Sequence, residues 1–545
     1  MFDFFSHRQS PNKAAIFFVP SLDPFENPLV ETNPATLRQW ATALPFANPD
    51  QLCEAVLTSL VRLNRFPAAV RKRDELMEVY RTPVLRLLHG SAARKGSASL
   101  HALRRVMLEM AYGYSHIAND CLSIKANRKN LDRLNLAIYY AIKFYLQEYL
   151  YACEEFDCRA QHTYREISRL RTFAEEQKIN RMPVDEGDHP GVERSIEQQY
   201  NRFLLLRLLD PCHLQEGEPR ICFEYLDTVA SAAQCTPPGR DIDRSGHYVV
   251  DRLGEVPPSL FEPDGLDNLA QPRFTLFNLN PVSQQIHQLL RSLERSEDQS
   301  PIAMSRLTTQ EVTNLLARML KSWHIRPQRD SERHSTSGQV SLWTGLQNIY
   351  SYLTRDERQV TEEDAEENSE ITLTQAQSIQ TLSQDPTKPQ LIAHRFNQSR
   401  SGVALHLTIN PNAPSMVGEL VLISLEAGSG LSEWKIGIVK RALNRQAGTL
   451  EIGVQFIQGR IVPVSLQSTR RTTNMVEDET TEQPTYAGLY IDQGHTHRSS
   501  LIVPKHFFVL GQEYRVEEMI PTPTITPLQL LESTTHFERY RIKPV

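Results

Sequence analysis

The chain has 545 residues, with 59 Lys and Arg against 65 Asp and Glu, which gives a formal net charge of −6. This length predicts more than one domain, and the slight acidity argues against a dedicated nucleic-acid-binding protein. No long uncharged apolar run is present, so we expect no helix that inserts into a membrane.

The number of cysteines and the N-terminal sequence both bear on the compartment. Seven cysteines cannot all pair in disulfides, and they form no CxxC motif. The first residues, MFDFFSHRQSPNKAAIFF, lack a basic start followed by an apolar stretch and a cleavage site. These features predict a cytoplasmic protein.

Residues 1–213 are expected to form an α-helical domain. From about Thr36 to Cys212, apolar residues recur at intervals of three and four, as in the series Leu52, Val56, Leu60 and Leu63. The stretch 131–156 is the most aromatic of the chain, and its tyrosines surround the helix instead of following one stripe. A ligand-stacking platform is one interpretation, but core packing of a central helix is favoured.

The next two segments differ in character. Residues 214–275 are rich in Pro, Gly, Asp and Arg, which predicts a loop-rich excursion with one or two short strands. Residues 276–325 are expected to be helices that link to the following domain, at Pro281–Leu293 and Thr308–Trp323. Thr308 or Thr309 is the expected N-cap of the second, with Glu311 in its first turn.

Beyond Trp323 the pattern becomes that of β-strands, which gives the chain a multidomain α + β fold class. Runs at 403–409, 419–425, 434–440 and 450–457 have the spacing of a small antiparallel barrel or sandwich. Residues 342–390 interrupt it as an insertion, with a helix at 342–353 and an acidic run at 356–370. Residues 485–545 are β-rich again, either as a second unit or as strands that complete the first.

We find no motif of an enzyme or a metal site. The sequence lacks a phosphate-binding loop, HExxH, GxSxG and GxGxxG, and His495 and His497 have no third ligand nearby. We therefore expect no catalytic residue, no catalytic cofactor and no metal.

Two short polar motifs suggest ligand binding instead. Asn397, Ser399 and Gly402 form a turn of short polar side chains beside a flexible backbone position, which suits the edge or phosphate of a planar ligand. Arg329 and Arg333, four residues apart, suit a doubly anionic ligand through bidentate bonds. An ordinary tight turn is the alternative for the first motif. An arginine pair made by residues 395 and 400, which flank the turn, is the alternative for the second.

Along the chain the arginine pair comes first, then the polar turn, then the strands WKIGIVK and LEIGVQF. In that order these motifs resemble the PilZ domain, a bacterial receptor domain for cyclic di-GMP. The resemblance covers residues 326–468, which it predicts to be a PilZ-like β-barrel. It implies that Arg329 and Arg333 contact phosphates and stack on guanine, while Asn397, Ser399 and Gly402 line the opposing turn.

The expected function follows from that resemblance. The chain would be a cyclic di-GMP effector in which nucleotide binding at the barrel rearranges the N-terminal helical module, and this module would bind a protein partner. No nucleic acid is expected as a partner. The alternative is a PilZ-like scaffold that binds no nucleotide and docks onto a motility, pilus or envelope-associated machine. The helical region itself shows no recognised family.

Overall fold

The computed structural model describes residues 16–23, 29–89, 97–124, 127–157, 160–186, 194–238, 245–262, 273–295, 300–325, 332–358, 391–408, 416–426, 432–446, 449–468, 485–492, 494, 499–517 and 524–544. The chain divides into a helical unit, residues 1–212 and 217–326, and a barrel unit, residues 213–216 and 327–545. The predicted fold class is thereby confirmed: a helical N-terminal region precedes antiparallel β-barrels.

The helical unit contains the helices α1 (Pro34–Thr42), α2 (Pro49–Arg65), α3 (Val70–His89), α4 (Ser97–Cys121), α5 (Arg128–Glu154), α6 (Gln161–Glu176), α7 (Ile196–Leu208), α8 (Glu218–Val229), α10 (Asn280–Glu294) and α11 (Thr309–His324). It also contains the strands β1 (Gln234–Thr236), β2 (His247–Asp251), β3 (Ser259–Leu260) and β4 (Phe274–Asn278), in the order β1-β4-β2-β3.

Helix α2 shows why these segments are helical. The Asn48 side chain accepts a hydrogen bond from the Gln51 N–H at 3.2 Å, and Pro49 occupies the first turn, where its missing N–H costs nothing. The apolar series that the sequence predicts for this helix, 52, 56, 60 and 63, is buried. Its amphipathic face is therefore confirmed.

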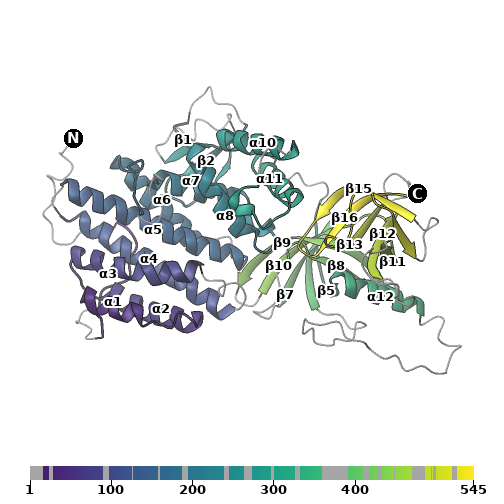
Figure 1. Cartoon of the computed structure of the whole chain (residues 1–545), viewed down its shortest axis with the longest axis horizontal. Helices are drawn as coiled ribbons and strands as arrows, with labels where there is room; N and C mark the ends of the chain where they lie inside the picture. Colours follow the sequence, from purple (N-terminus) through teal and green to yellow (C-terminus); the bar gives the residue numbers. More distant parts are fainter. Residues whose placement is uncertain are drawn as a thin grey trace, which may run out of the picture. The chain divides into compact units, whose positions relative to one another are not determined.

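Helix α5 is the central helix of the unit. It lies between α4 and α6 (Figure 1), and Tyr139, Tyr145 and Tyr149 are 0% exposed. The Tyr114 ring of α4 stacks on Tyr140 with 5.0 Å between the ring centroids. The tyrosines therefore fill the core, as the sequence predicts, and do not form an open stacking platform.

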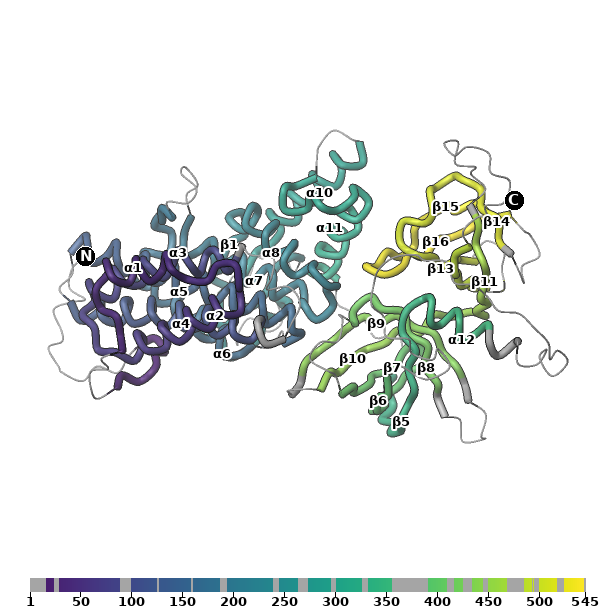
Figure 2. The backbone as a smooth tube through the Cα atoms, turned by 60° about the horizontal axis from the view of Figure 1, so that its bottom comes forward, coloured from purple at the N-terminus to yellow at the C-terminus, as the bar shows by residue number. Residues whose placement is uncertain are grey.

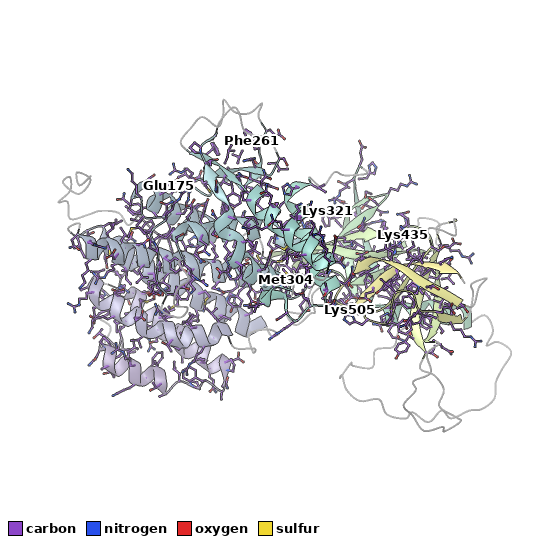
Figure 3. All side chains as sticks on the ribbon, turned by 45° about the horizontal axis from the view of Figure 1, so that its top comes forward. Glu175, Phe261, Met304, Lys321, Lys435 and Lys505 are labelled. Atoms are coloured by element: carbon purple, nitrogen blue, oxygen red, sulfur yellow. The ribbon has the colours of Figure 1, made fainter. Side chains whose placement is uncertain are left out.

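Residues 214–275, which the sequence predicts to be rich in loops, contain more regular structure than expected. Helix α8 buries Cys222, Leu226 and Val229, at intervals of four and three, on a single face. Strand β4 pairs with β1 and β2, and β2 pairs with β3. Just after β2, Arg252 donates at 2.9 Å to the carboxylate of Glu175 on α6, which is labelled in Figure 3. These strands have two to five residues each, which is too short for an alternating pattern to be recognised.

Helix α11 has the start that its sequence predicts. The Thr308 hydroxyl accepts from the Glu311 N–H at 3.3 Å, and the Glu311 carboxylate accepts from the Thr308 N–H at 2.8 Å. This reciprocal pair is a capping box, so the predicted N-cap is confirmed.

The first barrel consists of β5 (His334–Thr344), β6 (Leu391–Ser399), β7 (Gly402–Thr408), β8 (Leu420–Glu426), β9 (Ser432–Gln446) and β10 (Thr449–Phe456). It closes in the order β10-β7-β6-β5-β8-β9. Strands β7 to β10 coincide with the four predicted runs. The expected helix at 342–353 begins only at Leu346, as α12 (Leu346–Arg358), because Leu342 and Trp343 pair with β8 at the end of β5.

The second barrel consists of β11 (Arg460–Ser468), β12 (Tyr486–Asp492), β13 (Ser500–Pro504), β14 (Tyr514–Glu517), β15 (Thr524–Ser533) and β16 (Phe537–Pro544). It closes in the order β11-β12-β13-β16-β15-β14. The C-terminal β-rich residues thus form a barrel of their own. Strand β11 also belongs to this second barrel, because it pairs with β12 and β14. The sequence analysis assigns β11 to the first barrel instead, within residues 326–468.

Helix α12 and a shared apolar core join the two barrels. Figure 2 shows α12 between them, and its Ile349 is 0% exposed. The core combines Trp343, Leu420, Leu422, Ile436 and Ile438 of the first barrel with Leu489, Ile491, Ile502 and Phe537 of the second. The Tyr350 hydroxyl of α12 also bonds to Ser465 Oγ at 2.8 Å. One side of each barrel is therefore covered by the other.

Among the described residues, no helix combines the length and apolarity needed to cross a bilayer. The acidic run at 356–370 lies outside the described residues from 359 onward, and so does the rest of the predicted insertion up to 390.

Truncation of Ile349 tests the shared core. Ile349→Ala is expected to lower the free energy of unfolding of the barrel unit by about 2–4 kcal/mol, because a cavity would form between the barrels. Urea unfolding of the full-length chain measures this change. The exposed Gln347 on the same helix provides the control, since Gln347→Ala should change stability by no more than about 0.5 kcal/mol. Equal stability of the two variants would contradict the shared core.

Candidate functional site

The polar-turn motif, Asn397, Ser399 and Gly402, forms the connection between β6 and β7. Ser399 ends β6 and Gly402 begins β7, and the two residues pair directly across a two-residue turn. The Ser399 hydroxyl donates to the Gly402 carbonyl at 3.3 Å. The turn is therefore held by the motif's own side chain and backbone.

A β-bulge in β6 decides which way Asn397 points. Arg395 pairs with Leu405 and Asn397 with Ala404, so Phe396 is an extra residue in the strand. Neighbouring residues of β7 face opposite sides of the sheet, and Leu405 is 0% exposed inside the barrel. Asn397 consequently lies on the opposite side, the outer face of the barrel, together with Ser399 and Gly402.

The structure brings Arg333 to this same end of the barrel. Arg333 is exposed and directly precedes β5, where His334 pairs with Gln398 and Ser335 pairs with Asn397. Continuing this register, position 333 lies beside Ser399. Four of the five candidate residues thus lie at one end of the β5-β6-β7 sheet, while Arg329 lies outside the described residues.

The two arginines of the alternative pair, Arg395 and Arg400, lie in different surroundings. Arg395 lies on the inner side of β6 and donates to the Gln398 side chain at 2.8 Å. Arg400 is an exposed residue of the turn. The two guanidinium groups therefore do not share the face that carries Asn397.

Gly402 has a packing role that is independent of any ligand. A Cβ at this position would lie 2.4 Å from the Val454 carbonyl oxygen of β10. The Phe456 N–H donates to the Ser401 carbonyl at 2.9 Å, which holds β10 against the turn. Only glycine permits this close approach of the two backbones.

Sequence reasoning did not single out Arg441. Arg441 lies on β9 and pairs with Gly453 of β10, which in turn pairs with Ala404 of β7. The orientation of Arg441 depends on a β-bulge that only the pairing of β9 with β10 reveals, so no local sequence signal marks this position. At the other end of β9, Lys435 lies 5.3 Å above the Phe456 ring (Figure 3).

A cavity of about 570 Å³ lies between α1 and α2 in the helical unit. Its lining combines Trp40 and Leu37 with the charged Glu31, Glu54 and Arg62. Within the described part of the chain, no three His, Cys, Asp or Glu side chains gather as a metal-binding cluster would.

Comparison with known families gives one match. Residues 35–239 match the model of the N-terminal domain of the cyclic-di-GMP receptor FimW. This region is the part of the helical unit for which the sequence analysis recognised no family, and the match does not extend to residues 326–468, which resemble PilZ. No curated protein matches the chain.

The packing role of Gly402 can be tested by a single methyl group. Gly402→Ala should lower the free energy of unfolding by about 1–3 kcal/mol, because β7 and β10 must separate to admit the Cβ. Urea unfolding without nucleotide measures this. Gln455, the exposed partner of Gly402 on β10, supplies the control, and Gln455→Ala should unfold as the unsubstituted protein does. If Gly402→Ala has an unchanged free energy of unfolding, packing does not require this glycine. Only a role in ligand binding would then remain for it.

Proposed function

We propose that this protein is a cyclic di-GMP receptor and that the nucleotide binds on the outer face of the first barrel. The observation that carries the proposal is the convergence of Arg333, Asn397 and Ser399 at one end of the β5-β6-β7 sheet. The match of the helical region to the N-terminal domain of a cyclic-di-GMP receptor supports the same ligand independently.

The chemistry of these side chains suits the ligand. Cyclic di-GMP carries two phosphates, and an exposed guanidinium binds a phosphate through two parallel hydrogen bonds or stacks on a purine. The Asn397 amide both donates and accepts, and the Ser399 hydroxyl does the same, so either can bond a base edge or a phosphate oxygen. Arg329 is proposed as the second arginine of the pair on the resemblance alone.

Binding would be coupled to the helical unit through the chain that joins the two units. Helix α11 ends at His324 and β5 begins at His334, so the arginine pair lies within the connection itself. A nucleotide that holds these arginines against the barrel changes the conformations open to the connection, and so those open to the helical unit. The helical unit is proposed to bind a protein partner in the cytoplasm. No step of this process requires catalysis.

Substitution of Arg333 tests the site. Arg333→Ala should weaken cyclic di-GMP binding by about 10- to 100-fold, since a hydrogen-bonded charge pair is lost. Ser399→Ala should weaken it by roughly 3- to 10-fold, because its hydrogen bond is between neutral groups or to one charge. Isothermal titration calorimetry on the full-length protein measures both, with GTP and cyclic AMP as ligand controls.

Arg460 provides the matched arginine control, because it is exposed on β11 of the second barrel. Arg460→Ala should bind as the unsubstituted protein does. Unchanged affinity of Arg333→Ala would refute the site. If the unsubstituted protein itself gives no heat and no thermal shift with cyclic di-GMP, the scaffold alternative replaces the receptor.

Hydrogen–deuterium exchange tests the coupling. Saturating cyclic di-GMP should slow amide exchange in peptides that cover the start of β5, because their backbone becomes ordered around the ligand. It should also change exchange in α11, Thr309–His324. Slower exchange at β5 with no change anywhere in the helical unit would show binding without the proposed coupling.

A further inference from the structure

Four residues lie directly opposite one another across four strands of the first barrel. Asn397 of β6 pairs with Ala404 of β7, Ala404 with Gly453 of β10, and Gly453 with Arg441 of β9. Directly paired residues of an antiparallel sheet point to the same side. Arg441 therefore shares the outer face with Asn397, at the far end of one row.

Arg441 owes its orientation to a second β-bulge. Val454 pairs with Val439 but Gly453 pairs with Arg441, so Lys440 is an extra residue in β9. Before the bulge Ile438 faces outward into the shared core, and an unbroken alternation would turn Arg441 into the barrel. Two bulges in two different strands thus place Asn397 and Arg441 on one face, and bulges of this kind often re-aim side chains beside binding sites.

The surroundings of Arg441 leave its guanidinium suited to a further partner. The side chain is 31% exposed, and Nη1 lies 3.9 Å from Glu451 Oε1. This distance permits attraction but is too long for a hydrogen bond. The carboxylate holds the guanidinium near the row without occupying its donors there.

Gly453 leaves open the space beside Arg441, whereas Ala404, the next residue of the row, is buried. A Cβ at 453 would meet, among the described residues, only the Arg441 Cβ at 3.6 Å, which is ordinary contact. At Gly402 and Gly437 the nearest atoms would lie at 2.4 Å and 2.5 Å, so packing requires glycine at those two positions. Packing does not require it at 453, and glycine within a strand often marks the close approach of a ligand.

The span of the row fits a ligand with two bases. Three strand spacings of about 4.8 Å separate Asn397 from Arg441 by roughly 14 Å. A cyclic dinucleotide whose phosphates and one base contact Arg333, Asn397 and Ser399 can extend its second base along the row to Gly453. That base would reach Arg441 with its edge.

We infer that Arg441 recognises the second base as guanine, through paired hydrogen bonds to O6 and N7. Guanine offers two acceptors in the spacing of the guanidinium fork, whereas adenine places an amino donor where guanine has O6. Arg441 is therefore the residue that distinguishes cyclic di-GMP from cyclic di-AMP. This inference rests on the proposed function, because it assumes that a cyclic dinucleotide binds to this face.

Two substitutions of Arg441 separate guanine recognition from phosphate binding. Arg441→Ala should weaken cyclic di-GMP binding at least ten-fold and leave the affinity for cyclic di-AMP, measured directly or by competition, within about two-fold. Arg441→Lys should lose as much as Arg441→Ala, because an ammonium retains the charge but not the two-pronged geometry. Calorimetry on the full-length protein, with thermal unfolding of each variant as the test of folding, measures these effects.

A variant of Gly453 fills the space beside Arg441 and keeps the arginine itself. Gly453→Val should unfold at the same or a higher temperature than the unsubstituted protein and weaken cyclic di-GMP binding at least ten-fold, since the branched side chain covers the row. Arg515→Ala, at an exposed position of β14 in the second barrel, is the control and should bind normally.

The outcomes distinguish this inference from the proposed function. Normal binding by Arg441→Ala or by Gly453→Val, beside impaired binding by Arg333→Ala, overturns the guanine contact and leaves the receptor intact. Affinity restored in Arg441→Lys, or an equal loss for cyclic di-AMP, shows a phosphate contact and also overturns it. Absence of binding by the unsubstituted protein overturns both proposals.

Discussion

Closure of the first barrel by antiparallel pairing is the constraint on which the candidate site depends. Once six strands close on one another, the register fixes for every residue whether its side chain lies inside the barrel or on the outer face. Two extra residues, Phe396 in β6 and Lys440 in β9, each reverse that assignment for the rest of their strand. The polar side chains that follow them, Asn397 and Arg441, consequently lie on one outer face although about forty positions separate them in the chain.

The same strand links this face to the contact between the barrels. Ile436 and Ile438 of β9 belong to the apolar core shared with the second barrel, and Arg441, just beyond the bulge, belongs to the row opposite Asn397. The second barrel therefore covers one side of the first barrel and anchors the strand that carries Arg441. A binding side chain on an anchored strand loses little conformational freedom when a ligand arrives, which favours affinity.

Periodicity in the sequence identified most helices and the strands β7 to β10, but not α8, β5 or β6, and not which strands pair. The apolar face of α2, the burial of α5 on all sides, the capping box of α11 and strands β7 to β10 all follow from local patterns, because each depends on residues that are close in the chain. The assignment of β11 to the second barrel depends on pairing with β12 and β14, and an alternating strand such as β11 carries no mark of which barrel it joins. Arg441 was missed for a related reason, since its orientation depends on a bulge that only the pairing with β10 reveals.

The candidate contacts divide into two groups that would serve a receptor differently. Asn397, Ser399 and Arg441 lie on strands of the closed barrel, so they would meet the ligand in the same way whatever the state of the connection to the helical unit. A ligand shifts a conformational equilibrium only through contacts that differ between the two states. Under the proposed function, contacts from the connection between α11 and β5, where Arg333 lies, would satisfy that condition, whereas barrel contacts would not. Barrel residues would therefore determine which nucleotide binds, and the arginines before β5 would determine what binding does to the helical unit.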